Sequence, residues 1–208
     1  MPKTDRIIVA AFDFDGTLTK RDTLLPFLLF ATGPVGFILR MARLAPVLLA
    51  YAFRLMRNDR AKEKVLAAFL AGHSLERIES MGVEFAARRL PALLMTRAMA
   101  RVVWHQKQGH VCVLVSASLI HYLEPWAQRA GFDHIIASCL ETDAQGLITG
   151  RLKGGNCYGA EKALRLQTLL GAKGDYILYA YGDSPGDRHM LDMADHRYYR
   201  IIPAETDA

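Results

Sequence analysis

The chain has 208 residues, which is enough for one domain with a sizeable core or for a core that carries a small inserted unit. A hydrophobic content of 51% and a charged content of 23% are typical of a globular protein and exclude a disordered one. The formal net charge of +5 is spread along the chain without a dense basic run interleaved with aromatic residues, so we expect no nucleic-acid partner. The three cysteines form no C-x-x-C pair, which argues against a disulfide framework and a zinc site. Because no long apolar segment precedes Asp13, we expect no secretory signal and a cytoplasmic protein.

The first part of the chain predicts one strand followed by a helical region. Arg6–Phe12 is rich in β-branched residues and ends in a polar turn, which is typical of a buried strand. Leu24–Met56 is long and apolar and contains several prolines and glycines, so we expect a series of helices broken at the prolines. Arg60–Leu70 and Ser74–Leu90 have the apolar stripe of amphipathic helices, and Ser74 is a good N-cap residue.

Strands and helices alternate over the rest of the chain. We expect strands at Val111–Val115, Ile135–Ala137, Tyr176–Tyr181 and Tyr198–Ile202, helices at Ala92–Gln108, Ile120–Ala130, Gly159–Leu170 and Pro185–Met193, and a hairpin at Cys139–Leu152. The strands are almost continuously apolar, which favours a parallel sheet covered by helices on both faces. The helical region separates the first strand from the others and is therefore predicted to be an insertion. The expected class is α/β, with a core domain of residues 1–19 and 91–208 and a helical cap domain of residues 20–90.

Carboxylates and small hydroxyl groups follow three of the expected strands. Ligands of a parallel sheet bind at the carboxyl ends of its strands, so these side chains should meet at one edge. A lysine at the start of the helix before the third of these strands can reach the same edge. The candidate site residues are Asp13 and Asp15 after the first strand, Ser116, Ala117 and Ser118 after the second, Lys162 in the helix, and Asp183 and Asp187 after the strand at 176–181.

The clustered carboxylates indicate a divalent cation. Like charges a few ångströms apart repel and raise each other's pKa, and a bound cation reverses both effects. Oxygen ligands without histidine or cysteine select a hard ion, so Mg²⁺ is the expected cofactor. With a phosphate ester bound, one aspartate could attack phosphorus while a neighbouring carboxylic acid protonates the leaving alcohol. Lys162 and the Ser116 hydroxyl would balance the charge on the phosphoryl oxygens.

These residues lie in segments that resemble the four motifs of the haloacid dehalogenase-like (HAD) hydrolases. Asp13-Phe14-Asp15-Gly16-Thr17-Leu18-Thr19 matches the first motif, and Val113-Leu114-Val115-Ser116 matches the second. Lys162 fits the third, with Lys153 as a competing candidate, and Gly182-Asp183-Ser184-Pro185-Gly186-Asp187 matches the fourth. The resemblance covers essentially the whole chain, and the position of the insertion is similar to that of subfamily IB, the phosphoserine-phosphatase-like group. It implies a Rossmann-like three-layer core with an inserted all-helical cap.

The resemblance also implies roles for the four aspartates in a phosphatase that forms an aspartyl-phosphate. Asp13 would be the nucleophile and a Mg²⁺ ligand. Asp15 would be the general acid/base and would give its backbone carbonyl to the metal. Asp183 would be the third protein ligand, and Asp187 would support the water shell of the metal and Lys162.

The expected substrate is a small phosphate ester, such as phosphoserine or histidinol phosphate. By the same resemblance, Ser116 and Lys162 would hold the phosphoryl group, with Ala117 and Ser118 beside it, although Ser118 is also placed to cap the next helix. Phosphoserine phosphatases use an acidic residue shortly after the first motif for the amino group of the substrate, and Asp22 stands about there. They use a cap arginine for its carboxylate, whereas the nearby basic residues Arg60 and Lys64 are out of register here.

Other functions stay open from the sequence. The apolar cap is similar to that of phosphatidylglycerophosphate phosphatases in this superfamily, which would suit a lipid substrate at a membrane surface. The residues that would fit an interfacial helix on anionic lipid are Arg40, Arg43, Arg54, Arg57 and Arg60. Leu24–Leu39 and Leu44–Phe53 are each shorter than the roughly 20 residues of a spanning helix. A phosphotransferase would keep the same aspartates, whereas a binding module without activity would be expected to lose Asp13 or Asp183. No pattern indicates an oligomeric state.

Overall fold

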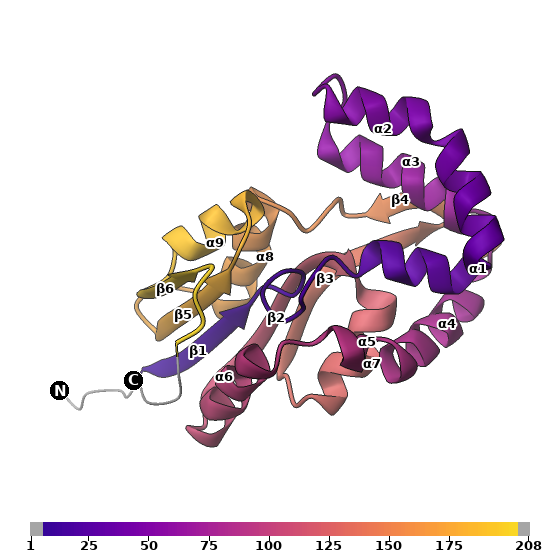
Figure 1. Ribbon diagram of the computed structural model, residues 1–208. Coiled ribbons are helices and arrows are strands. Elements are labelled where there is room, and N and C mark those ends of the chain that lie inside the picture. The colour runs from indigo at the N-terminus through magenta and orange to yellow at the C-terminus, as the bar shows by residue number, and fades with distance from the viewer. Residues whose placement is uncertain (1–5, 204–208) are drawn as a thin grey trace.

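The computed structural model describes residues 6–203 and contains a six-stranded sheet with helices on both faces (Figure 1). The strands are β1 (Ile7–Phe12), β2 (Val111–Leu119), β3 (His134–Thr142), β4 (Ile148–Lys153), β5 (Tyr176–Gly182) and β6 (His196–Tyr199). Their order across the sheet is β4-β3-β2-β1-β5-β6, and β4 is the strand that runs antiparallel to its neighbour. β1 thus lies between β2 and β5, and the carboxyl ends of these three strands meet at one edge of the sheet.

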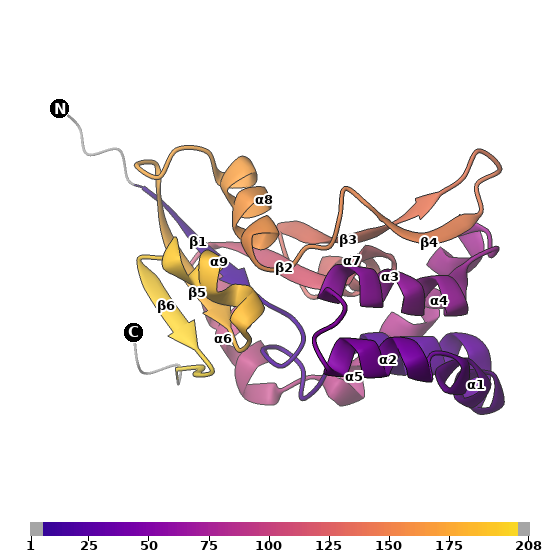
Figure 2. The same cartoon turned by 90° about the horizontal axis from the view of Figure 1, so that it is seen from above.

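The sheet is the middle of three layers because its central strands bury side chains on both faces. In β1, Ala10 and Phe12 pack on one face, and Val9 and Ala11 pack on the other. Helices α6 (Thr96–Lys107) and α7 (Ile120–Arg129) cover the first face, and α8 (Ala160–Leu170) and α9 (Arg188–Asp192) cover the second (Figure 2). The expected α/β class with a Rossmann-like three-layer core is confirmed.

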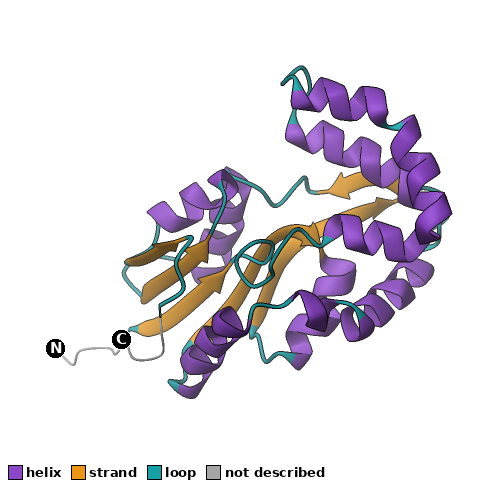
Figure 3. Ribbon diagram, in the orientation of Figure 1, coloured by secondary structure: helices purple, strands orange, loops and turns teal. Residues whose placement is uncertain are grey.

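Helices between β1 and β2 lie beyond the carboxyl edge of the sheet, and we call them the cap helices (Figure 1): α1 (Leu24–Arg43), α2 (Ala45–Ala52), α3 (Asn58–Leu70) and α4 (Leu75–Arg88). α1 bends at Gly33, whose φ of 70° and ψ of 168° are not helical, directly before Pro34 (Figure 3). A proline disfavours a helical residue before it, so the expected break occurs there. Pro26 does not break the helix, because it lies in the first turn, where no hydrogen bond of the helix is lost.

The hairpin of β3 and β4 packs against the cap helices. β3 pairs with β2 and then continues to pair with β4, so it is a single strand of nine residues rather than the short strand and separate hairpin that were expected. Ile148 exchanges backbone hydrogen bonds of 2.9 Å with Gly72 and His73, which follow α3. Gly150 has a φ of +87°, and a Cβ at this position would lie 2.3 Å from the Cα of Ala67. α3 therefore rests directly on the backbone of β4.

Two expected elements near the C-terminus have different boundaries. The strand expected at Tyr198–Ile202 is β6, which starts two residues earlier because Asp195 hydrogen-bonds the backbone of β5 and begins the pairing there. The helix expected at Pro185–Met193 is a 3₁₀ turn (Pro185–Asp187) followed by α9. The Asp187 carboxylate accepts hydrogen bonds from the backbone N–H groups of Asp183 and Ser184, which precede this turn. These bonds hold the turn in its own conformation, separate from α9.

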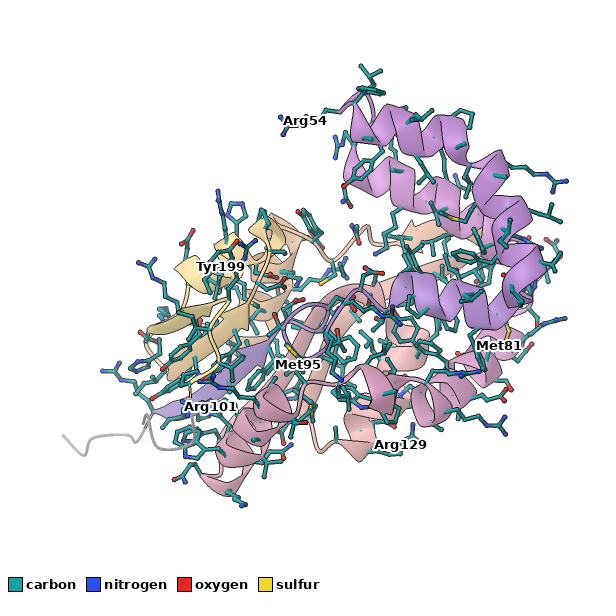
Figure 4. The ribbon with its side chains drawn as sticks, in the orientation of Figure 1. Arg54, Met81, Met95, Arg101, Arg129 and Tyr199 are labelled. Carbon is teal, nitrogen blue, oxygen red and sulfur yellow. The ribbon has the colours of Figure 1, made fainter. Side chains whose placement is uncertain are left out.

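The segments that enter and leave the cap helices lie side by side. Leu94 pairs with Thr19 in an antiparallel bridge, and backbone hydrogen bonds of 2.9 Å on either side of the bridge join the same two segments. This pairing divides the helix expected at Ala92–Gln108 into a short α5 (Leu90–Leu93) and α6. Met95, which follows the bridge, lies near the centre of the molecule (Figure 4).

Candidate active site

A cleft of about 620 Å³ lies between the carboxyl edge of the sheet and the cap helices. One side is formed by the segments that follow β1 and β5 and by the last residues of β2, and the other by residues of α1, α2 and α3. Of the site residues expected from the sequence, those that line the cleft are Asp13, Asp15, Asp22, Ser116, Ala117, Ser118, Lys162 and Asp183. The remaining one, Asp187, is fully buried behind Lys162. The structure therefore brings together residues that are up to 174 positions apart in the chain.

Asp13 lies at the end of β1 and pairs with a buried lysine. Its backbone N–H donates to the Tyr181 carbonyl at 2.9 Å, which continues the pairing of β1 with β5 and fixes the position of the carboxylate. Lys162 Nζ donates to Asp13 Oδ1 and, at 2.6 Å, to Asp187 Oδ1. Lys162 thus lies where the resemblance implied, whereas the competing Lys153 is exposed at the end of β4.

Burial and charge set the pKa values of this cluster. The pKa of Asp13 is raised to about 7, because burial and the Asp187 carboxylate raise it more than Lys162 lowers it. Burial would lower the pKa of Lys162, but the carboxylates of Asp13 and Asp187 outweigh it, so the net shift is upward and the lysine stays protonated. Burial and Asp187 also raise the pKa of Asp183. The cluster therefore holds more carboxylate groups than one lysine can balance.

The same carboxylates form a donor set that fits a divalent cation. Asp13, Asp183 and Asp187 each place one oxygen within 4.8 Å of the others, and Thr17 Oγ1 donates to the first two at 3.3 Å. Gly16 leaves room for Asp183, because its φ is +83° and a Cβ there would lie 2.4 Å from Asp183 Oδ2. Asp187 is fully buried and its Oδ2 accepts three hydrogen bonds, whereas Asp13 and Asp183 line the cleft and are therefore the better ligands. Clustered carboxylates with raised pKa values suit a hard ion such as Mg²⁺.

Asp15 is held by hydroxyl groups from both the cap and the core. Thr23, which precedes α1, donates its backbone N–H at 2.8 Å and its hydroxyl at 2.7 Å to Asp15 Oδ1. Ser118 Oγ donates to Asp15 Oδ2. Burial raises the pKa of Asp15 to about 6, Asp22 adds to this, and the hydrogen bonds from Ser118 and Thr23 lower it. The idea that Ser118 caps the next helix is wrong, because the N-cap of α7 is Leu119.

The end of β2 presents three small residues to the cleft. The pairing of β2 with β3 shifts in register over this stretch, so these residues leave the regular ladder. Ser116 is buried, and its Oγ accepts a hydrogen bond from the Ser118 N–H at 3.0 Å. The carbonyl oxygen of Ala117 accepts a hydrogen bond from Lys62 Nζ, which reaches across from α3.

Lys62 is a cleft residue that the sequence analysis missed. Its Nζ donates to the Ala117 carbonyl and, at 2.8 Å, to Asn156 Oδ1 from the loop after β4. Burial lowers the pKa of Lys62 to about 8, although Asp15 and Asp22 act in the opposite direction. The lysine is therefore a cation that two neutral acceptors hold in the cleft.

A signal for Lys62 was present in the helical periodicity. It lies four residues before Leu66 and seven before Phe69, which are both buried, so it is on the inner face of α3. Arg60 and Lys64, the residues considered from the sequence, line a separate hollow beside β4.

Asp22 lies at the start of α1, where its Oδ1 accepts hydrogen bonds from the N–H groups of Leu24 at 2.9 Å and Leu25 at 3.3 Å. This bonding stabilises the first turn of the helix, and Asp22 lines the cleft. Its contact with the amino group of a substrate, which the resemblance implied, stays a prediction.

The model of the haloacid dehalogenase-like hydrolase family matches residues 10–192. The chain belongs to this family. Protein CicA of Caulobacter vibrioides is 38% identical over 201 residues, which cover 94% of this chain and 86% of CicA. A histidinol-phosphatase of Neisseria meningitidis serogroup C is 27% identical over 192 residues, which cover 89% of this chain and 86% of that protein. The sequence prediction of a HAD hydrolase is therefore confirmed.

Solved structures of this HAD hydrolase fold agree with the architecture. A Bordetella pertussis Tohama I protein of unknown function superposes with a TM-score of 0.77 at 28% identity, covering 90% of this chain and 86% of that one. A substrate-bound phosphoserine phosphatase complex has a TM-score of 0.60 at 16% identity, covering 91% of this chain and 83% of that one. At this identity, the second comparison concerns the fold alone. The predicted enzyme class of a HAD-type hydrolase agrees with the family match.

Proposed function

We propose that the protein is a Mg²⁺-dependent phosphomonoester hydrolase that acts through an aspartyl-phosphate on Asp13. The observation that carries this proposal is the placement of two carboxyl groups at one edge of the sheet in different surroundings. Asp13 forms an ion pair with Lys162, whereas Asp15 accepts hydrogen bonds from hydroxyl and backbone donors and forms no ion pair with any of residues 6–203. Carboxyl groups whose surroundings differ in this way suit a nucleophile and an acid/base.

The reaction would take place in two steps. In the first, a carboxylate oxygen of Asp13 attacks phosphorus, the bond from phosphorus to the leaving oxygen breaks, and the Asp15 proton moves to that oxygen. In the second, Asp15 takes a proton from water, whose oxygen displaces Asp13 from phosphorus and releases inorganic phosphate. Lys162 and Ser116 would hold the phosphoryl oxygens in both steps. Both carboxyl groups then return to their starting states.

Asp13 and Asp183 would hold the Mg²⁺ ion, together with the backbone carbonyl of Asp15. When bound, the ion would neutralise charge on the phosphoryl oxygens. Thr17 supports this role, because its hydroxyl bonds both carboxylates and sets their spacing. Asp187 would act behind the ligands by fixing Lys162 and the turn that carries Asp183.

We propose that residues 20–90 act as a cap domain over a core of residues 1–19 and 91–208. Residues of the cap would contact the leaving group and so determine the substrate specificity. Lys62 and Asp22 offer one positive and one negative side chain on the cap side of the cleft. Phosphoserine, whose leaving group carries an ammonium and a carboxylate, could contact both side chains, whereas histidinol phosphate has no carboxylate and could pair with Asp22 alone. The similarity to the Neisseria histidinol-phosphatase supports a small phosphorylated metabolite, and a cytoplasmic location agrees with such a substrate.

A lipid phosphate ester is a second candidate, favoured by the apolar part of the cleft. The apolar residues that line its cap side are Leu24, Leu25, Leu48, Tyr51, Ala61 and Val65. These side chains could accommodate the glycerol and first acyl carbons of a lipid while the phosphate reaches Asp13.

A phosphate-release screen with Mg²⁺ tests the proposal, with phosphoserine, histidinol phosphate, an aryl phosphate and phosphatidylglycerophosphate in detergent micelles as substrates. Asp13→Asn should lower turnover by at least about a thousandfold, because the amide cannot form the aspartyl-phosphate. The matched control is Asp192→Asn, an exposed aspartate on α9, which should retain full activity. Retained turnover in Asp13→Asn would contradict the mechanism. If the wild type hydrolyses none of these esters, the result favours the alternative functions, a phosphotransferase or a binding module without activity.

A further inference from the structure

The cap helices α1 and α2 carry an apolar face that nothing in the described structure covers. Nine of the seventeen large apolar side chains that are exposed in the described residues lie between Leu25 and Leu55. On α1, Val35, Ile38 and Leu39 share one side of the helix. α2 has eight residues without a charge and contains no buried residue. A cluster of exposed apolar side chains on neighbouring helices indicates an interaction surface.

The same segment is basic. Residues 24–58 contain no aspartate or glutamate, and their charged residues are Arg40, Arg43, Arg54 and Arg57. Arg43 and Arg54 are exposed and form no ion pair with any of residues 6–203. Arg54 projects outward from the end of α2 (Figure 4), between Phe53 and Leu55, whose side chains are 73% and 82% exposed. Exposed arginines therefore stand next to exposed apolar side chains in the sequence, both on α1 and at the end of α2.

The packing of α1 argues that this surface lies on a membrane rather than crosses it. α1 is the helix, among those described, that has the length and apolar composition of a spanning helix. Its first half is part of the active-site wall, since Phe27 is fully buried and its ring lies 5.4 Å from that of Phe85 and 4.9 Å from that of Tyr122. The bend at Gly33 then separates this half from the exposed second half. Insertion across a bilayer would remove the first half from the core.

We propose that the outer face of α1 and α2 docks on the surface of a membrane that contains anionic phospholipid. The apolar side chains would enter the boundary between headgroups and acyl chains, and the arginines would pair with lipid phosphates. A second copy of the chain is a poorer occupant. A symmetric dimer would bring two identical basic faces together, and residues 24–58 offer no acidic side chain to pair with the arginines.

The docking face is continuous with the cleft. Leu25 of α1 and Leu48 and Tyr51 of α2 line the cleft, and Leu25 and Tyr51 are also exposed beside the docking face. A phosphate ester that is anchored in the bilayer could therefore approach Asp13 without leaving the membrane surface. This last step rests on the proposed phosphatase function, whereas the docking itself does not.

Co-sedimentation with vesicles, without substrate, tests the docking. Wild-type protein should bind vesicles of phosphatidylcholine and phosphatidylglycerol, bind pure phosphatidylcholine vesicles more weakly, and dissociate as salt is added. The double variant Phe53→Ser/Leu55→Ser should lower the partition coefficient by about tenfold or more, because both side chains leave water on docking. Arg43→Gln/Arg54→Gln should remove the preference for anionic vesicles. Leu164→Ser, which changes a 58% exposed leucine on α8, is the matched control and should bind like the wild type.

Circular dichroism and thermal unfolding of each variant verify that the protein is folded, without reliance on turnover. Failure of the wild type to bind anionic vesicles, or equal binding by the Phe53→Ser/Leu55→Ser variant, would overturn the proposal. Light scattering would identify a second copy as the occupant if the wild type dimerises, binds no vesicles, and becomes monomeric in the same variant. Because binding is measured without turnover, a negative result here leaves the phosphatase proposal intact, and an inactive enzyme leaves the docking proposal intact.

Discussion

Two lysines of the site lie in opposite electrostatic surroundings. Lys162 is enclosed between the carboxylates of Asp13 and Asp187, which keep it protonated and immobile. Lys62 donates only to a backbone carbonyl and to Asn156, and burial lowers its pKa to about 8. A buried lysine that lacks a carboxylate partner gains the most from an anionic ligand. We therefore expect Lys62 to contact a negatively charged group on the leaving side of the ester.

Replacement of Lys62 by methionine should raise KM for an ester whose leaving group carries a carboxylate by about tenfold to a hundredfold, because a charge-assisted hydrogen bond is lost. The same change should alter KM for an uncharged aryl phosphate much less. Lys64→Met, an exposed position on the same helix, is the control and should leave both values unchanged. Steady-state kinetics with the two substrates distinguish the roles, and an equal loss for both would show that Lys62 only supports the fold.

The charge of Lys62 also predicts a pH dependence. As pH rises through about 8, the free enzyme loses the Lys62 proton, so KM for the charged ester should increase above this pH. Lys62→Arg should keep a low KM to higher pH, because the guanidinium does not titrate in this range. Measurement of KM from pH 7 to pH 9.5 tests this, and the same profile in both proteins would contradict it.

Individual elements differ in how far local sequence determines them. β1 follows from a β-branched run that ends in a polar turn, and Ser74 caps α4 as expected, accepting a hydrogen bond from the Arg77 N–H at 3.3 Å. β3 is longer than expected because its second half pairs with β4, and β4 in turn packs on α3, which comes some seventy residues earlier. A local pattern contains no information on such a partner.

The site divides in the same way. Asp13, Asp15 and Asp183 follow strands, and the rule that parallel strands share a carboxyl edge was sufficient to bring them together. Lys62 lies on a cap helix and Asn156 in a loop. The contact between these two residues depends on how the cap helices pack over the sheet. That packing is set by contacts such as the close approach of Gly150 to Ala67, which no strand rule predicts.

Gly150→Ala should destabilise the protein by about 2–4 kcal/mol, because the new methyl group would meet the backbone of α3 and the backbone at this position has a positive φ. Gly146→Ala is the matched control. It lies in the same hairpin with a φ of +77° but has open space around it, so strain alone should cost about 1 kcal/mol. Urea denaturation measures both values. Equal losses would mean that the contact between β4 and α3 contributes nothing.

For the molecule as a whole, the folded state holds neutral histidines in its interior. His121 of α7 is 7% exposed, its Nε2 accepts a hydrogen bond from the Leu140 N–H at 3.3 Å, and burial lowers its pKa to about 4. His105 of α6 is fully buried against Tyr181, and burial lowers its pKa to about 3. In the unfolded chain, both would titrate near pH 6.5. Below that pH the unfolded state binds protons that the folded state excludes, so each histidine lowers stability as the pH falls.

His121→Gln should therefore make the protein less sensitive to acid. Between pH 7.5 and pH 5, the wild type should lose about 2 kcal/mol more of its free energy of unfolding than the variant does, since glutamine keeps an acceptor but takes up no proton. The raised pKa values of Asp13 and Asp15 act in the opposite direction in both proteins, which is why the difference between the two is the quantity to measure. Urea denaturation at the two pH values provides it, and parallel losses would contradict a neutral His121.

The bridge between Thr19 and Leu94 means that everything between them begins and ends at one place. The stretch therefore connects β1 to the rest of the core in the way that a loop would. Doubling the length of a loop costs only about 0.6 kcal/mol in closure entropy. Descendants of such a gene can extend, trim or exchange the stretch while the register around Asp13 is preserved. Selection can thus change the length and contacts of this stretch while Asp13 stays in register, as long as the hydrogen bonds from Thr23 to Asp15 are kept.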